Sequence, residues 1–113
     1  MVDINFRTGK LQKELCEEKK LKRVHGPRRA ELIERRLAEI EAAPTLAVLR
    51  TIPGQRCHEL KGGLKGYLSV DLDHPYRLIF VPDHDPVPQL ASGGMDWSQI
   101  TAVMIQEVTN THE

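Results

Sequence analysis

The most unusual cation in this sequence is Arg77, the only lysine or arginine among the last 47 residues. It lies near the start of the apolar segment 76–82, YRLIFVP, which is typical of a buried strand. A guanidinium beside apolar side chains is costly unless an anion pairs with it. Two interpretations follow. Arg77 forms a salt bridge with Asp71 or Asp73 across a hairpin, or it is aimed at an anionic ligand.

A second group of possible phosphate ligands is the segment LKGGLKG, residues 60–66. Its glycines allow the backbone to come close to a ligand, and Lys61 and Lys65 supply positive charge. The order of residues is not that of a nucleotide-binding P-loop. The segment is therefore either a phosphate-binding turn or a solvated basic loop.

The histidines offer acid–base chemistry but no metal site. His112 lies one residue from the C-terminus, where it is either a catalytic imidazole or an unstructured terminal residue. The other four histidines and the two cysteines show none of the spacings of metal ligands. The sequence thus predicts neither a metal nor a cofactor.

The elements that would position these residues change in period along the chain. We expect a strand over 4–7, a helix over 8–20 capped by Thr8, a helix from Pro27 to about residue 43, and a helical turn over 45–50. Alternation then predicts a strand over 67–72, a reversal at 73–75, a central strand over 76–82 and a last strand over 98–109. Helices followed by consecutive strands indicate an α+β fold.

Composition indicates a small globular protein whose charge is unevenly distributed. The length of 113 residues predicts a single domain over 1–113. We expect a cytoplasmic protein with reduced Cys16 and Cys57 and no membrane partner. Residues 1–66 carry 15 Lys/Arg and 9 Asp/Glu, whereas residues 67–113 carry 1 and 7. The basic half either faces a polyanion or displays ordinary surface cations of exposed helices.

The stretch RCHELKGGLKGYLSVDLDHPYRLIF resembles the core of the HigB group of RelE-type toxins from bacterial toxin–antitoxin pairs. The resemblance rests on Leu60-Lys61-Gly62, a strand over 67–72, the reversal 73–75 and the pair Tyr76-Arg77. It implies a RelE-like fold, in which an N-terminal strand and two helices pack on a mostly antiparallel sheet of about four strands.

The resemblance further implies a ribosome-dependent mRNA endonuclease that inhibits translation and serves plasmid maintenance. The ribose 2′-OH would attack the adjacent phosphate without a metal or other cofactor. By position, Lys61 would stabilise the phosphate or shuttle a proton, Arg77 would hold the scissile phosphate, and His112 would be the general acid or base. The implied RNA-binding residues are Lys65, Arg56, Tyr76, Arg28 and Arg29.

The implied partners are a HigA-like helix-turn-helix antitoxin, the ribosome and mRNA, with DNA contacted only through the antitoxin. Asp73 and Thr111 depart from the pattern, since relatives often carry an arginine and a tyrosine there. Two alternatives therefore stay open. One is a ParE-like toxin that inhibits gyrase, and the other is a catalytically weakened member that acts mainly as an antitoxin-binding co-repressor.

Overall fold

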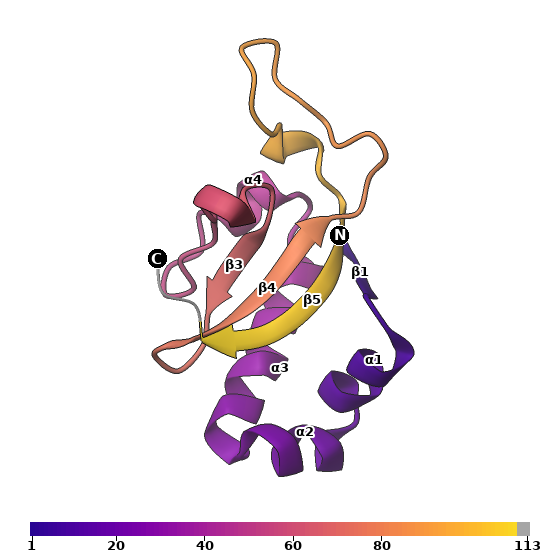
Figure 1. Cartoon of the computed structure of the whole chain (residues 1–113), viewed down its shortest axis with the longest axis vertical. Helices are drawn as coiled ribbons and strands as arrows, with labels where there is room; N and C mark the ends of the chain where they lie inside the picture. The colour runs from indigo at the N-terminus through magenta and orange to yellow at the C-terminus, as the bar shows by residue number, and fades with distance from the viewer. Residues whose placement is uncertain (111–113) are drawn as a thin grey trace.

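The computed structural model describes residues 1–110 as a helical layer packed on one face of a sheet (Figure 1). The helices are α1 (Gly9–Cys16), α2 (Glu18–His25), α3 (Pro27–Ala42) and α4 (Leu46–Leu49). The strands are β1 (Asp3–Phe6), β2 (His58–Glu59), β3 (Leu68–Asp71), β4 (Tyr76–Pro82) and β5 (Ala102–Asn110). Two 3-10 turns, η1 (Gly62–Leu64) and η2 (Trp97–Gln99), complete the elements. The predicted α+β class is confirmed.

The expected helix over 8–20 is wrong in its extent, because the chain breaks into two helices at Glu17. This residue has extended backbone angles, φ −91° and ψ 113°. The break lets Leu15 and Leu21, which are six residues apart, both reach the core, where each is 1% exposed. The cap at Thr8 is confirmed, since its hydroxyl accepts a hydrogen bond from the Leu11 amide at 3.0 Å. The helix from Pro27 is confirmed as α3.

The sheet has the strand order β1-β5-β4-β3-β2, so β4 is central as its apolar sequence predicts. The mostly antiparallel pairing is confirmed, whereas the predicted count of about four strands is one too low. The sheet has five strands because His58–Glu59 pairs with β3, and a two-residue strand leaves no periodic signal. It is mixed because β1 pairs with β5 in parallel, while the other three pairings are antiparallel. No helix within residues 1–110 is long and apolar enough to span a lipid bilayer.

The two faces of the sheet differ in chemistry. Leu68, Val70, Leu78 and Phe80 are fully buried and join the core that α3 covers. Side chains alternate along a strand, so the intervening Ser69, Asp71, Arg77 and Ile79 lie on the opposite face. We call this second face, which the helices do not cover, the open face, although its Ser69 and Ile79 side chains are buried. It carries the predicted strand arginine.

One charged side chain lies inside the core and connects the two layers. Arg36 of α3 is 7% exposed, because it lies on the same buried face of the helix as Ile33 and Ile40. Its guanidinium donates to the Asp71 carbonyl at 2.7 Å, to the Gly54 carbonyl at 3.3 Å and to Glu39 at 2.9 Å. A buried guanidinium is tolerated because these acceptors replace water. Arg36 therefore fixes the backbone of β3 and of the segment before β2.

Replacing Arg36 should unfold the protein more easily than replacing its neighbour. Arg36→Met keeps much of the side-chain volume but leaves the Asp71 and Gly54 carbonyls and Glu39 without their donor. We expect a loss of about 2–4 kcal/mol in the free energy of unfolding, measured by urea titration. The control is Arg35→Met, whose side chain is 58% exposed and should cost under about 0.5 kcal/mol. Equal effects of the two variants would contradict the anchoring role.

Candidate functional site

The open face of β2, β3 and β4 brings two of the predicted site residues, Arg56 and Arg77, together. His58 pairs with Ser69, and Asp71 pairs with Arg77, so these side chains share one face. Next to Arg77 on the other side stands Thr109 of β5. Strands that are hydrogen-bonded in a central sheet hold such positions rigidly, which is what a phosphate-binding or catalytic group requires.

Arg77 forms the salt bridge that the first interpretation proposed, with Asp71. The Arg77 Nε lies 3.6 Å from the Asp71 Oδ1, and the Arg77 side chain is 16% exposed. Arg56 approaches the same carboxylate, with its Nε 2.7 Å from the Oδ2. Two guanidinium groups thus converge on one anion at the open face. For Arg77 to bind a phosphate in this position, the Asp71 carboxylate would have to move away.

Asp73 does not join this cluster, because it pairs with the first turns of α3. Arg29 donates two hydrogen bonds to the Asp73 carboxylate, at 2.8 and 3.1 Å. The Arg29 guanidinium also stacks on the Tyr76 ring, 3.5 Å from its centroid. The bidentate hydrogen bonds from Arg29 lower the pKa of Asp73 below its ordinary value. Arg29 and Tyr76, predicted to bind RNA, here hold the β3–β4 reversal against α3.

Lys61 and Lys65 lie on an exposed turn at the other end of β3. Lys61 precedes η1 and Lys65 follows it, and both are exposed. The Glu59 carboxylate accepts from the Gly66 amide at 3.0 Å and closes the turn. Because the Leu60 amide bonds to Tyr67, Lys61 is level with Gly66 and stands about five residues, or roughly 17 Å, along the chain from the level of Asp71 and Arg77. The backbones of Lys61 and Arg77 therefore lie near opposite ends of β3.

A histidine that the sequence interpretation left aside lies between these two groups. His58 is half-buried on the open face, and its Nδ1 lies 2.8 Å from the Arg56 carbonyl. A carbonyl only accepts, so the Nδ1 donates, and in the neutral imidazole the Nε2 carries the lone pair that a general base needs. The signal in the sequence was its place two residues before the LKG turn. His112 and Thr111 lie outside the described residues, and the role of His112 stays a prediction.

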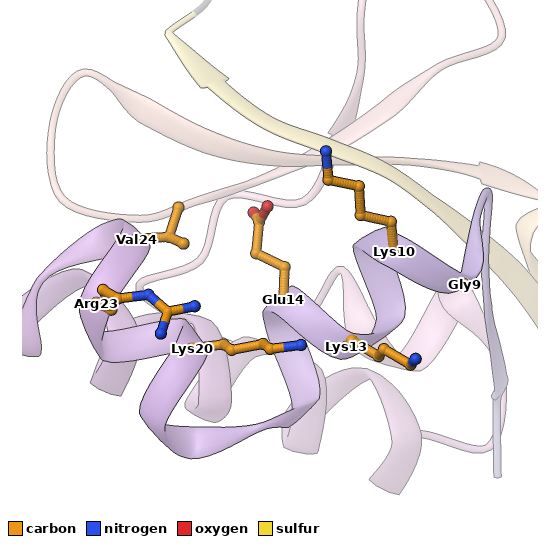
Figure 2. A pocket seen from close by; sticks show the side chains of 7 residues that line it. All are labelled: Gly9, Lys10, Lys13, Glu14, Lys20, Arg23 and Val24. Carbon is orange, nitrogen blue, oxygen red and sulfur yellow. The ribbon is translucent and has the colours of Figure 1, made fainter.

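The basic half of the chain forms a groove on the helical layer. A cavity of about 520 Å³ lies between α1 and α2, and Figure 2 shows the side chains that line it. Four of these are cationic: Lys10, Lys13, Lys20 and Arg23. The single carboxylate among them, Glu14, is held by His25 at 2.9 Å. Arg28 is exposed in the first turn of α3. The surplus of positive charge here fits a polyanion.

Neither cysteine resembles a nucleophile, and no metal-binding group forms within residues 1–110. Cys57 is 7% exposed, and burial raises the pKa of its thiol to about 12. Burial also raises the pKa of the Cys16 thiol. Both groups are protonated at neutral pH. The chemistry available in the described part of the site is that of cations and an imidazole.

Comparison with known proteins connects this site to a family. The model of the RelE-like toxin of the type II toxin–antitoxin system HigB matches residues 4–88, which include β2, β3, β4 and all of β1 except Asp3. The chain belongs to the HigB-like toxin family. It is also 44% identical over 46 residues to Toxin HigB-1 of Vibrio cholerae serotype O1 (strain ATCC 39315 / El Tor Inaba N16961). That match covers 41% of this chain and 48% of the relative, so it spans about half of the relative's length.

The Arg29–Asp73 pair should make stability depend on pH. The pKa of Asp73 is lowered on folding, so its stabilising effect is present above the unfolded value of about 3.9 and is lost as the pH falls through the lower, folded value. We expect Asp73→Asn to lower the free energy of unfolding by about 1–2 kcal/mol at pH 7. The difference from wild type should shrink steadily below about pH 4.

The measurement is urea unfolding followed by circular dichroism between pH 2.5 and 7. Asp85→Asn, at an exposed position, serves as the control for removing one carboxylate. A difference between Asp73→Asn and wild type that stays constant across this range would contradict the ion-pair interpretation.

Proposed function

We propose that this HigB-like chain is the toxin of a type II toxin–antitoxin pair and that it cleaves mRNA on the ribosome. The observation that carries the proposal is the family match over residues 4–88, which contain Lys61, His58 and Arg77. An antitoxin partner follows from the same family, and a HigA-like helix-turn-helix protein is the form that we propose. The sequence interpretation of one domain over 1–113 belongs to this proposal.

The reaction that suits these residues is attack of a ribose 2′-OH on the neighbouring phosphate. It needs a proton acceptor, a donor for the leaving 5′-oxygen, and cations where negative charge develops. Lys61 and Arg77 are the cations. His58 is positioned by the Arg56 carbonyl to accept the proton at its Nε2. His112 is proposed as the second acid–base group. Lys65 and Arg56 would hold the flanking RNA.

The groove between α1 and α2 would rest on ribosomal RNA. Its four cations lie in the helical layer, away from the open face, so they can contact a second polyanion while mRNA occupies the sheet. Binding through such contacts is electrostatic and weakens steeply with added salt. Arg28 at the start of α3 would extend the same surface.

A second candidate function is supported by one observation. Arg77 is paired with Asp71, which lowers the positive potential available to a phosphate. This favours a catalytically weakened toxin that acts mainly as an antitoxin-binding co-repressor. A ParE-like gyrase inhibitor receives no comparable support, because the matching family model is the HigB-like one.

The direct test is to express the chain in a bacterium and map mRNA 5′ ends. Wild type should arrest growth and produce new 5′ ends inside translated codons. Lys61→Ala, Arg77→Ala, His58→Ala and His112→Ala should each reduce cleavage by about 10² or more, the usual weight of one acid–base or charge-stabilising group. Lys22→Ala, at an exposed position of α2, is the control and should behave as wild type.

Identical growth and transcripts in all strains would overturn the nuclease proposal. A protein that leaves mRNA intact but still binds its antitoxin and changes operator affinity would establish the co-repressor. Induction of the DNA-damage response with intact mRNA would establish the gyrase inhibitor.

The groove generates a separate prediction about ribosome binding. Lys20→Gln with Arg23→Gln removes two charges from the groove, whereas Lys19→Gln with Lys22→Gln removes two charges from the same helical hairpin outside the groove lining. For binding to the ribosome, the first double variant should reduce the slope of log Kd against log salt concentration by about 1.4, the value for two lost phosphate contacts to single-stranded RNA. The second should change it much less. Equal changes in slope for the two double variants would show that positive charge on the helices promotes binding without a defined contact surface.

A further inference from the structure

The strongest unexplained feature of the open face is that two arginines share one carboxylate. Asp71 stands directly opposite Arg77 in the β3–β4 pairing. Its Oδ2 lies 2.7 Å from the Arg56 Nε and its Oδ1 lies 3.6 Å from the Arg77 Nε. Arg56 comes from the segment before β2 and reaches this point with a positive φ of 46°, which is uncommon for arginine. Three separate segments of the chain therefore converge on one anion.

The position of this anion is fixed by the backbone. The Asp71 amide donates to the Gln55 carbonyl at 2.7 Å, and the Asp71 carbonyl accepts from the buried Arg36 at 2.7 Å. These bonds hold the Cα, so only rotation of the side chain can move the carboxylate. The guanidinium groups of Arg56 and Arg77 converge on one position, and the Asp71 carboxylate occupies that position.

The pairing of Asp71 with the two arginines is incomplete. Its Oδ1 is buried, yet within residues 1–110 it accepts no hydrogen bond. The contact with Arg77 at 3.6 Å is an ion pair without the geometry of a hydrogen bond. Two guanidinium groups that converge on one carboxylate can also bind a phosphate, which has more acceptor oxygens. A small cavity of about 50 Å³, lined also by His74, Pro75 and Tyr76, adjoins the pair.

We propose that Arg56 and Arg77 form one binding site for an RNA phosphate, and that the Asp71 carboxylate occupies this site until RNA displaces it. The inference rests on the proposed function, because it takes the open face as the RNA-binding surface. Asp71 then has two effects. It keeps the two guanidinium groups converged, and it competes with the phosphate for them. A phosphate can therefore enter the site only when the RNA strand is already aligned with Arg56 and Arg77.

The consequence is that this chain binds free RNA more weakly than its cations would allow. A phosphate that enters must either move the carboxylate or accept its repulsion, and both oppose binding. Asp71→Asn removes the charge at constant size and keeps one oxygen acceptor for the arginines. Affinity for a single-stranded polyanion should therefore rise when this carboxylate alone is neutralised.

The test is fluorescence anisotropy with a labelled single-stranded DNA oligonucleotide, which has phosphates but no 2′-OH and is not cleaved. We expect Asp71→Asn to bind about tenfold more tightly than wild type. The plot of log Kd against log salt should steepen by about 0.7, the value for one added contact to a single strand. Glu107→Gln is the matched control, because it also removes one carboxylate from a β5 position paired with Ile79. It should change the Kd by less than twofold.

A second variant separates this site from the general effect of charge. In the double variant Arg56→Gln with Asp71→Asn, the gain should disappear, because one of the two guanidinium groups is gone. Arg56 is exposed, so this change should leave the fold intact, which thermal unfolding monitors. A Kd for Asp71→Asn that is unchanged or weaker than wild type, with unfolding unaltered, would overturn the inference.

The two proposals fail in different ways. If wild type cleaves mRNA but Asp71→Asn does not tighten binding, the nuclease proposal stands and the displaced-carboxylate site is wrong. If Asp71→Asn tightens binding while no mRNA is cut in any strain, the anion site stands and the chain is a binding protein.

Discussion

The arrangement of the open face depends on one buried guanidinium. Arg36 lies at a core position of α3, 7% exposed, and reaches the carbonyls of Asp71 and Gly54. One carbonyl belongs to β3 and the other to the segment that leads into β2. Because both acceptors are backbone atoms, Arg36 fixes where the chain runs and leaves the nearby side chains available. The helical layer thus determines the geometry of a surface on the far side of the sheet.

Two carboxylates near the β3–β4 reversal have opposite consequences. Asp73 looked from the sequence like an unfavourable negative charge beside a polyanionic substrate. In the structure, two nitrogens of the Arg29 guanidinium donate to the Asp73 carboxylate and neutralise it. This ion pair connects the β3–β4 reversal to α3. Asp71 is the carboxylate that lies among the cations of the open face. Under the proposed function, the electrostatic cost to substrate binding would therefore come from Asp71, two residues before Asp73.

Much of the fold could be predicted because it follows from local patterns. The stripe of Ile33, Leu37 and Ile40 and the proline at the start of α3 marked one helix clearly. The apolar run 76–82 marked the central strand. The break at Glu17 could not be predicted, since Glu17 is an ordinary helix residue and the break serves the burial of Leu15 and Leu21. Tertiary packing overrode local propensity there.

The site was harder to predict than the fold for a similar reason. Arg77 had two interpretations, and the choice depended on which carboxylate stood opposite it. The register of the β3–β4 pairing decides that, since it places Asp71 opposite Arg77. His58 was missed because its importance comes from the Arg56 carbonyl and its place between Lys61 and Arg77. Such relations between segments are absent from residue types and spacing.

The uneven distribution of charge acquires a physical meaning once both layers are considered together. The groove of α1 and α2 has four cations around one engaged carboxylate, and it can attract a polyanion over a distance of about one Debye length, near 10 Å. On the open face, by contrast, Asp71 offsets the positive charge of the nearby arginines. The helical layer therefore provides long-range attraction for a polyanion, whereas binding at the sheet depends on short-range geometry. Under the proposed function, such a protein would be drawn to a large RNA assembly by its helices and would engage a phosphate of mRNA only where that assembly holds the strand in place. The restraint on the open face would then contribute selectivity, because free RNA offers the attraction without the alignment.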